Sequence, residues 1–230
     1  GGSSGFDTID RIAIMPNGDL LIAGNYCMYS DDNQCQLGLG GLMPLESTDE
    51  DGGENVFLAR LDSNGIWLWS TQIQSSKELP VLDMLVSTSN EIHFAVLFQG
   101  ILQFNGSEIV GPEVQNLLIA TYDGQGQVLS HRSAQADEGI EVSGALCIDG
   151  TGQMYVAVTF SGTFHIDGYD LDALGSTDVA VASYSEFGWN WAISAGGAGA
   201  DKTWDCDGKL TSGIHVVGDF SGNASFGSLF

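Results

Sequence analysis

Basic residues are scarce in this chain. Its 230 residues include 6 lysines and arginines against 30 aspartates and glutamates, which gives a formal net charge of −24 at pH 7. A surface this anionic repels phosphate backbones and anionic lipid head groups, so nucleic-acid binding and membrane-surface binding are disfavoured. We interpret the acidity first as a solubility feature and second as a capacity for cations.

Long apolar runs are also missing. No run approaches the roughly 20 residues that a membrane-spanning helix needs, so we expect no membrane insertion. A signal sequence and an initiator methionine are absent as well. We therefore expect residue 1 to lie inside a longer gene product. The opening GGSSG aligns with the later loop at 196–199, so we take it as native.

Motifs that identify common enzymes do not occur. There is no Gly-x-Ser-x-Gly nucleophile elbow and no phosphate-binding glycine loop that opens a helix. Carboxylates are so numerous that a close pair would not by itself indicate a glycosidase. The four histidines are scattered, and His93 and His215 fall in strand-like runs where core or edge positions are the simplest interpretation. We expect a protein that is not an enzyme.

No stretch shows a sustained helical period of 3.6 residues. The chain instead alternates short apolar runs with turn residues, and it has 32 glycines but only 4 prolines. The runs are nearly continuous in apolar character, as in 92–98, which is typical of strands buried on both faces. These features predict an all-β fold.

Two sequence markers repeat with a period near 60 residues. An apolar strand that closes on an aromatic residue recurs with spacings of 72, 62 and 60, at Tyr26, Phe98, Phe160 and Phe220. An apolar strand followed by a turn glycine recurs with spacings of 61 and 62, at Gly65, Gly126 and Gly188. A regular repeat of this length indicates an array of small sheets. Sheets packed face to face around an axis bury both of their faces, so we predict a β-propeller of four-stranded units.

The repeat divides the chain into about three and a half units. We expect a half-unit at 1–26, an insertion at 27–55, and repeats at 56–116, 117–177 and 178–230, with 178–222 forming one four-stranded sheet. A ring with half a unit to spare would expose a strand edge, which native proteins avoid. Either further repeats or strands from a partner should complete it, and we favour further repeats.

The repeat resembles the secreted bacterial seven-bladed β-propeller repeat family. The matching residues are Leu61–Gly65 with Trp69, Asp149–Gly152 before the strand 155–160, and Gly218–Gly222. Two copies depart from the pattern, because Ser130 replaces a tryptophan and Trp191 comes one residue early. The resemblance implies a propeller scaffold in an extracytoplasmic setting and no particular catalytic residue.

The four cysteines suggest an oxidising compartment. Cys27 and Cys35 flank a short polar loop, and a local disulfide is the first interpretation, with two free thiols as the alternative. Cys147 and Cys206 hold nearly equivalent positions in successive repeats. They could form a second disulfide, or each could be a single buried cysteine.

One acidic segment is the best candidate for a cation site. It carries Asp167, Asp170, Asp172 and Asp178, and calcium prefers several oxygen ligands of this kind. The spacing does not fit the twelve-residue helix–loop–helix pattern, however, and aspartate is also an ordinary turn residue. Calcium is the only cofactor that we consider.

Tryptophans and sequons give the remaining candidate sites. Most of the five tryptophans recur with the repeat, so we expect them to fill space between sheets. Trp204 is less periodic and is our candidate for a ligand contact at the surface. Asn105 and Asn223 begin sequons that a glycosylating host could modify.

These observations together predict a secreted or cell-surface structural module. We expect a stiff scaffold that displays loops such as 27–55 and 163–178 to proteins, to cell-surface or matrix components, or to other segments of the same larger protein. The alternatives are a lectin-like or calcium-dependent adhesin, and a hydrolase or dehydrogenase with its active site on the propeller axis.

Overall fold

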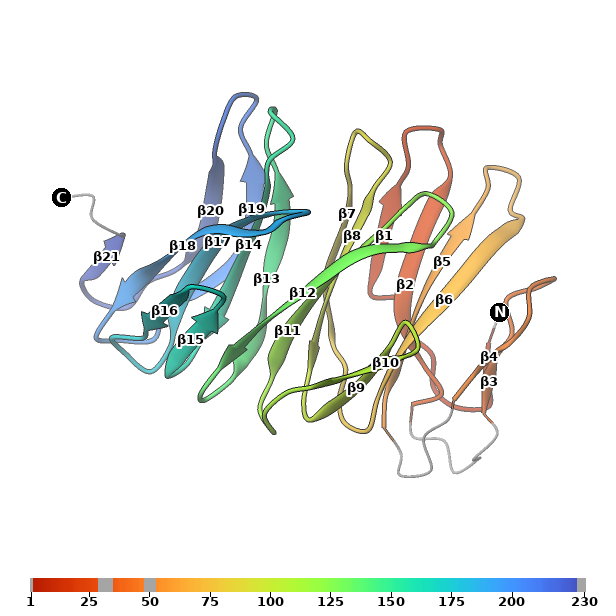
Figure 1. Ribbon diagram of the computed structural model, residues 1–230, viewed down its shortest axis with the longest axis horizontal. Helices are drawn as coiled ribbons and strands as arrows, with labels where there is room; N and C mark the ends of the chain where they lie inside the picture. Colours follow the sequence, from red (N-terminus) through yellow and green to blue (C-terminus); the bar gives the residue numbers. More distant parts are fainter. Residues whose placement is uncertain (1, 29–34, 48–52, 227–230) are drawn as a thin grey trace. The chain divides into compact units, whose positions relative to one another are not determined.

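Every regular element among the described residues is a β-strand. The computed structural model describes residues 2–28, 35–47 and 53–226, and its strands β1 to β21 are labelled in Figure 1. No helix occurs in this part of the chain. The prediction of an all-β chain is therefore confirmed.

The strands form three larger sheets and two short hairpins. The first sheet has the order β1-β2-β5-β6-β9-β10 and comprises Arg11–Ile14, Leu20–Tyr26, Asn55–Leu61, Trp67–Ser75, Ile101–Phe104 and Ser107–Val110. The second has the order β16-β15-β12-β11-β8-β7 and comprises Tyr169–Asp172, Thr163–Ile166, Val128–Ala136, Asn116–Tyr122, Ile92–Phe98 and Val81–Val86. The third has the order β13-β14-β17-β18-β21 and comprises Ile140–Ile148, Met154–Phe160, Asp178–Ser185, Gly188–Gly197 and Ala224–Phe226. The hairpins are β19–β20 (Lys202–Gly208, Ile214–Asp219) and β3–β4 (Gln36–Leu37, Leu45–Glu46).

The chain divides into two compact units. Unit 1 comprises residues 1–113 and 120–131, and unit 2 comprises 114–119 and 132–230. The boundary runs through β11 and β12, so unit 1 holds the whole first sheet and unit 2 holds the whole third sheet.

Each larger sheet contains the same antiparallel meander of four strands. In the first sheet these are β1, β2, β5 and β6, and in the third they are β13, β14, β17 and β18. The segment 178–222 supplies β17 and β18 to the third sheet and β19 and β20 to a separate hairpin. Our prediction that 178–222 forms one sheet was therefore wrong: the repeat begins with the third strand of one sheet and ends with the second strand of the next. Strand lengths and spacings alone do not reveal this difference in phase.

The Asp-x-x-Gly motif makes the tight turns between strands. In the turn after β5, the Asp62 carboxylate accepts the backbone N–H groups of Asn64 and Ile66 at 2.9 and 2.8 Å. The glycine that closes it, Gly65, has a φ of +83°, a conformation that favours glycine. The turns at 123–127 and 149–153 repeat the same carboxylate contacts. The motif is thus explained by local hydrogen bonding.

After the second strands β8, β14 and β20, the chain crosses to the preceding sheet. β9 and β10 follow β8 but extend the first sheet through the pairs Gln74↔Gln103 and Ser75↔Leu102. Likewise β15 pairs with the end of β12, and β21 pairs with β18. The segment 163–178, which we had predicted to be a displayed loop, therefore begins with a paired hairpin.

The insertion in unit 1 folds back onto its own sheet. A disulfide joins Cys27 to Cys35, and the hairpin β3–β4 follows it. Cys35, Leu37 and Leu39 are buried in one cluster with β5 residues, namely Phe57 and Ala59. The described part of 27–55 therefore caps a sheet face, which differs from the freely displayed loop that we had expected. Residues 29–34 and 48–52 of the insertion lie outside the described residues.

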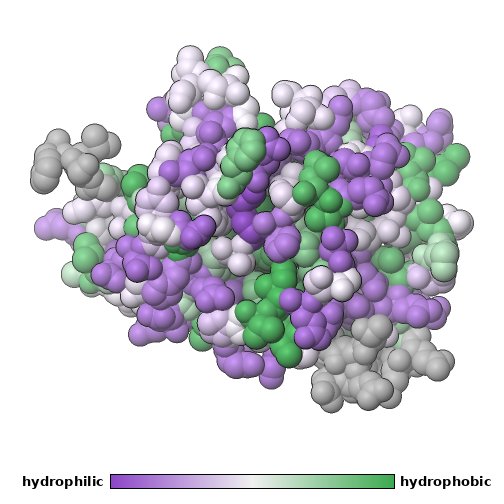
Figure 2. Space-filling model, in the orientation of Figure 1, coloured by the Kyte–Doolittle hydropathy of each residue, from purple (hydrophilic) through white to green (hydrophobic). Residues whose placement is uncertain are grey.

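In each unit, a following hairpin packs over the first strands of a sheet. β7 contacts β1 and β2 in unit 1, and β19 contacts β13 and β14 in unit 2 (Figure 1). Every residue of β14 is buried as a result. Hydrophilic residues predominate on the face shown in Figure 2, with hydrophobic residues in small separate groups between them.

Candidate functional site

The hairpin β19–β20 leaves one strand edge open. Among the described residues β20 pairs only with β19, whereas the second strands β2 and β14 each have a partner on both sides. The side chains of Val216 and Val217 are 37% and 61% exposed. Open strand edges are sites where another strand can add.

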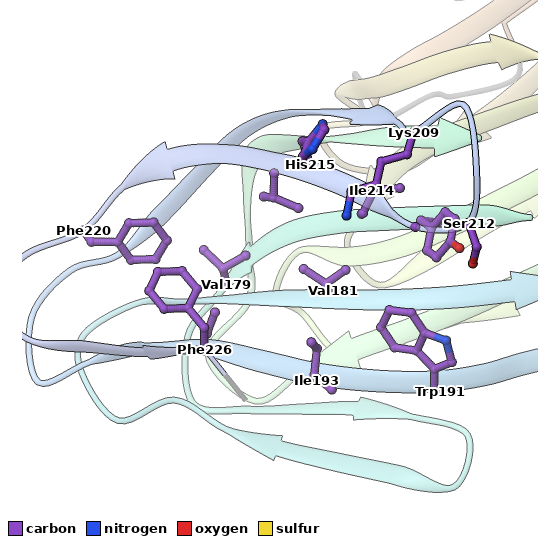
Figure 3. Close-up of a pocket in the computed structure, with 14 residues that line it drawn as sticks. Val179, Val181, Trp191, Ile193, Lys209, Ser212, Ile214, His215, Phe220 and Phe226 are labelled. Carbon is purple, nitrogen blue, oxygen red and sulfur yellow. The ribbon is translucent and has the colours of Figure 1, made fainter. Parts of the chain in front are cut away.

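A groove of about 600 Å³ lies beside this edge, wholly within unit 2. Its floor is formed by one face of β17 and β18, with Val179 and Val181 along β17 and Ile193 beside Val181 on β18 (Figure 3). β19 covers the neighbouring strands β13 and β14, and Cys206 and Ile214 of the hairpin pack against the buried cluster that contains Val179 and Val181. On the fourth strand, Trp191 and Ile193 stay 37% and 45% exposed. The groove is therefore an apolar sheet face with an unpaired strand along one side.

Aromatic rings mark both ends of the groove. The rings of Phe220 and Phe226 meet edge to face at one end, with centroids 4.7 Å apart. At the other end the Trp191 indole lies 5.9 Å from the ring of Tyr155, near Ser212 (Figure 3). Trp191 is 37% exposed. Rings placed in this way suit the burial of an extended apolar partner.

Asp149 fixes the loop at the Trp191 end. Its carboxylate accepts hydrogen bonds from the Tyr155 hydroxyl at 2.7 Å and from the Gly213 backbone N–H at 2.8 Å. Burial opposes ionisation of this carboxyl, but bonds from Thr151, Gly213 and Tyr155 outweigh it and hold the pKa of Asp149 well below its usual range. Burial and the bond to Asp149 also raise the pKa of Tyr155. The charged carboxylate therefore ties the β13–β14 turn to the loop between β19 and β20.

A smaller groove of about 400 Å³ lies in unit 1. Ile9, Ile22, Phe57 and Trp67 line it, together with residues of the folded insertion. Because Leu37 and Leu39 already cover much of this face, it offers less free apolar surface than the groove beside β20.

Both cysteine pairs form disulfides. Cys27 and Cys35 have Cα atoms 5.9 Å apart, and Cys147 and Cys206 have Cα atoms 6.0 Å apart. The second bond joins β13 to β19 and therefore fastens the open hairpin to the third sheet. Two disulfides fit an oxidising, extracellular environment.

The four aspartates of the predicted calcium site have separate roles. Asp170 bonds His165 at 2.8 Å, and Asp172 accepts the Thr163 hydroxyl at 2.9 Å. Asp167 is exposed in the β15–β16 turn, whereas Asp178 is 1% exposed and accepts the Leu174 N–H. Among the described residues no group of three or more His, Cys, Asp or Glu side chains could hold a metal ion. The structure does not bring these carboxylates together, and we do not retain the calcium site.

The other predicted surface residues lie apart from the groove lining. Trp204 is 53% exposed and donates its indole N–H to Asp219 at 2.8 Å. Asn105 occupies the exposed two-residue turn between β9 and β10, and Asn223 is exposed just before β21. Of the two strand histidines, His93 is buried beside Thr121, whereas His215 is exposed on β20 and does line the groove.

The groove could not be predicted because Trp191 departs by one residue from the sequence repeat. In the structure Trp191 pairs with Ser183, just as Trp69 pairs with Arg60. The two tryptophans therefore hold equivalent places, and the offset of one residue arises from a shorter turn before β18. Aligning strand registers, had they been known, would have singled out this position.

No helix long and apolar enough to cross a membrane occurs in the described part of the chain. No protein-family model matches this chain, and no curated protein is significantly similar to it. The resemblance to propeller repeats therefore stays a prediction, and the site has to be interpreted from its own geometry.

Proposed function

We propose that this chain is a segment of a β-propeller that serves as a non-enzymatic, extracellular structural and interaction module. The observation that carries the proposal is the recurring strand order: each larger sheet has a four-stranded meander, and the connections after β8, β14 and β20 each extend the preceding sheet. Face-to-face packing of successive strands within each unit supports the same architecture. The two disulfides support an oxidising location.

The proposed role is to hold a variable surface on a rigid frame. The connection after β2, residues 27–54, is longer than the equivalent connections 99–115 and 161–177, and it is the one held by its own disulfide. Length variation at one connection of a repeated frame is typical of a recognition element. Proteins or cell-surface and matrix components are the proposed partners.

A loop exchange tests this role. Residues 27–54 are replaced by a second copy of 99–115, and the wild-type and variant chains are compared for binding to immobilised extracellular-matrix proteins and to intact cells. We expect saturable binding by the wild type and loss of binding by the variant, with a cooperative melt for both. Replacing 161–177 by 99–115 is the matched control and should retain binding. Equal binding by all three chains, or none by the wild type, would refute the role.

The propeller architecture needs its own test. Electron microscopy of the intact gene product should show sheets arranged radially around an axis. Two flat layers packed as a sandwich would contradict the proposal.

A further inference from the structure

Unit 1 shows what covers the tryptophan of the fourth strand when its neighbour is present. The Trp69 indole N–H donates to the Gly124 carbonyl at 3.1 Å, and Arg60 donates to the same oxygen. Gly126 lies against the ring so closely that a Cβ there would come within 2.8 Å of it, and its φ is +79°. The turn at 123–126 between a third and a fourth strand therefore fits onto Trp69, and only glycine is suited to the contact position.

Unit 2 presents the equivalent tryptophan without that cover. Trp191 occupies the place of Trp69 in the strand register, but it stands at the end of the groove beside β20. Beyond it the floor residues Val179, Val181 and Ile193 line the groove as well. The turn 123–126 is the element that covers the equivalent tryptophan in unit 1.

We propose that the groove beside β20 binds an antiparallel β-hairpin of the third- and fourth-strand type of this repeat, supplied by a further repeat. The proposal rests on the propeller scaffold and names its partner. The incoming third strand pairs with the open edge of β20, and the incoming turn covers Trp191. Its carbonyl accepts the Trp191 indole N–H, and its closing glycine packs on the ring.

The existing pairs fix the register of the incoming strand. Asn55 lies opposite Tyr26, and Asp178 lies opposite Phe160. Both Asn55 and Asp178 begin a third strand and are buried. The incoming strand should therefore begin with Asn or Asp opposite Phe220 and run antiparallel to β20 toward Ile214.

A second copy of this chain is a poorer occupant than a further repeat. The third strands β5, β11 and β17 each already lie between a second and a fourth strand. A folded copy would have to break one of its own sheets to donate such a hairpin. The occupant must instead carry a third strand that has no second-strand partner of its own.

Binding of a synthetic hairpin to the whole chain tests the proposal. The probe is a peptide of residues 114–136, which includes β11, β12 and the turn 123–126. We expect saturable binding and slower amide hydrogen exchange across 214–219. Trp191→Ala should weaken binding roughly thirtyfold, as for a buried aromatic anchor. The matched control Trp204→Ala changes an exposed tryptophan outside the groove lining and should leave binding unchanged.

A peptide variant keeps the test valid if Trp191→Ala does not fold. Gly126→Val places a side chain where the ring must pack, so this peptide should fail to bind the unaltered chain. Peptide binding that is unaffected by Trp191→Ala and by Gly126→Val would overturn the proposal. Slower amide hydrogen exchange at a site other than β20 would overturn it as well. Sedimentation that shows Trp191-dependent dimers of the chain alone would identify a second copy as the occupant and refute the further repeat. If the peptide does not bind while the exchange of 27–54 still abolishes surface binding, only this inference fails. If the peptide binds as expected while the exchange of 27–54 leaves surface binding unchanged, only the display role fails.

Discussion

β14 and β20 are equivalent strands with opposite surroundings. Both are second strands of the repeat, and their sequences, MYVAVTF and IHVVGDF, are similar. β14 lies between β13 and β17 and is buried at every residue, whereas β20 has one partner within the described part of the chain and none of its own residues is buried. The difference teaches that a strand of this pattern is buried by its neighbours and not by its own composition.

The largest expected effect comes from shortening the aromatic residue that closes each strand. Phe160 is fully buried, so Phe160→Ala should lower the free energy of unfolding by roughly 3 to 5 kcal/mol. Phe220 is 40% exposed, and Phe220→Ala should cost only about 1 kcal/mol because less apolar surface is lost. Urea denaturation of both variants measures the contrast. Similar losses would mean that the edge strand is covered in solution.

Removing the Cys147–Cys206 disulfide should loosen the open hairpin and not β14. This bond closes a sequence separation of 59 residues, so the double alanine variant should lose roughly 3 to 4 kcal/mol. The Cys27–Cys35 disulfide closes a separation of only 8 residues, so the matched double alanine variant should lose roughly 2 kcal/mol of unfolding free energy. Hydrogen exchange should rise mainly across 202–219 in the first variant. Faster hydrogen exchange across β14 instead would contradict the expectation that this disulfide mainly fastens the β19–β20 hairpin to β13.

A smaller effect is expected at Asp178, which is the first residue of a third strand and lies opposite Phe160. The other two third strands begin with a buried, uncharged asparagine, Asn55 or Asn116. At Asp178, burial raises the pKa of the carboxyl. Because the folded protein disfavours the charged form, ionisation of Asp178 reduces stability above the carboxyl's ordinary pKa. Asp178→Asn should therefore stabilise the chain at pH 7 by removing the charge that burial disfavours.

The stabilising effect of Asp178→Asn should vanish near pH 3, where the wild-type carboxyl is protonated. Melting temperatures at both pH values measure it. The reciprocal variant Asn116→Asp should be destabilised at pH 7, and stabilisation by both changes would refute the argument.

The smallest effect concerns β15 and β21, the strands that follow β14 and β20. In β15, bonds to Asp170 and then Asp137 raise the pKa of His165, whereas β21 has Ser225 at the corresponding place. The stabilisation is fully present below the ordinary histidine pKa and is lost as pH rises through the higher folded pKa. His165→Ser should thus lower the melting temperature at pH 5.5 more than at pH 8.5. Since His165 is 44% exposed, the effect should stay below about 1 kcal/mol. An effect that grows with pH would contradict the assignment.

Strand positions and turns were predictable because they depend on local chemistry. Tyr26, Phe98 and Phe160 each end a strand as predicted, and Asp62–Gly65 forms the expected turn. The Cys27–Cys35 pairing was also the favoured one, since a short loop leaves little choice.

Sheet membership was not predictable in the same way. The pairing of β9 with β6 rests on two residue pairs, Gln74↔Gln103 and Ser75↔Leu102, which no local pattern marks. The groove beside β20 was not predictable either. Its floor consists of strands whose sequences are as apolar as those of fully buried strands. Among the described residues, the predicted calcium ligands form no group of three or more, and Asp178 instead accepts the Leu174 N–H.

The sequence by itself determined that this chain is made of short β-strands, where they begin and end, and with what period they recur. Apolar runs, Asp-x-x-Gly turns and glycine positions act within a few residues, so they can be read along the chain. Only the tertiary structure decided which strands share a sheet, that the insertion covers a sheet face, and that β20 keeps an open edge. These outcomes depend on contacts between distant segments, because burial is a property of what lies beside a strand.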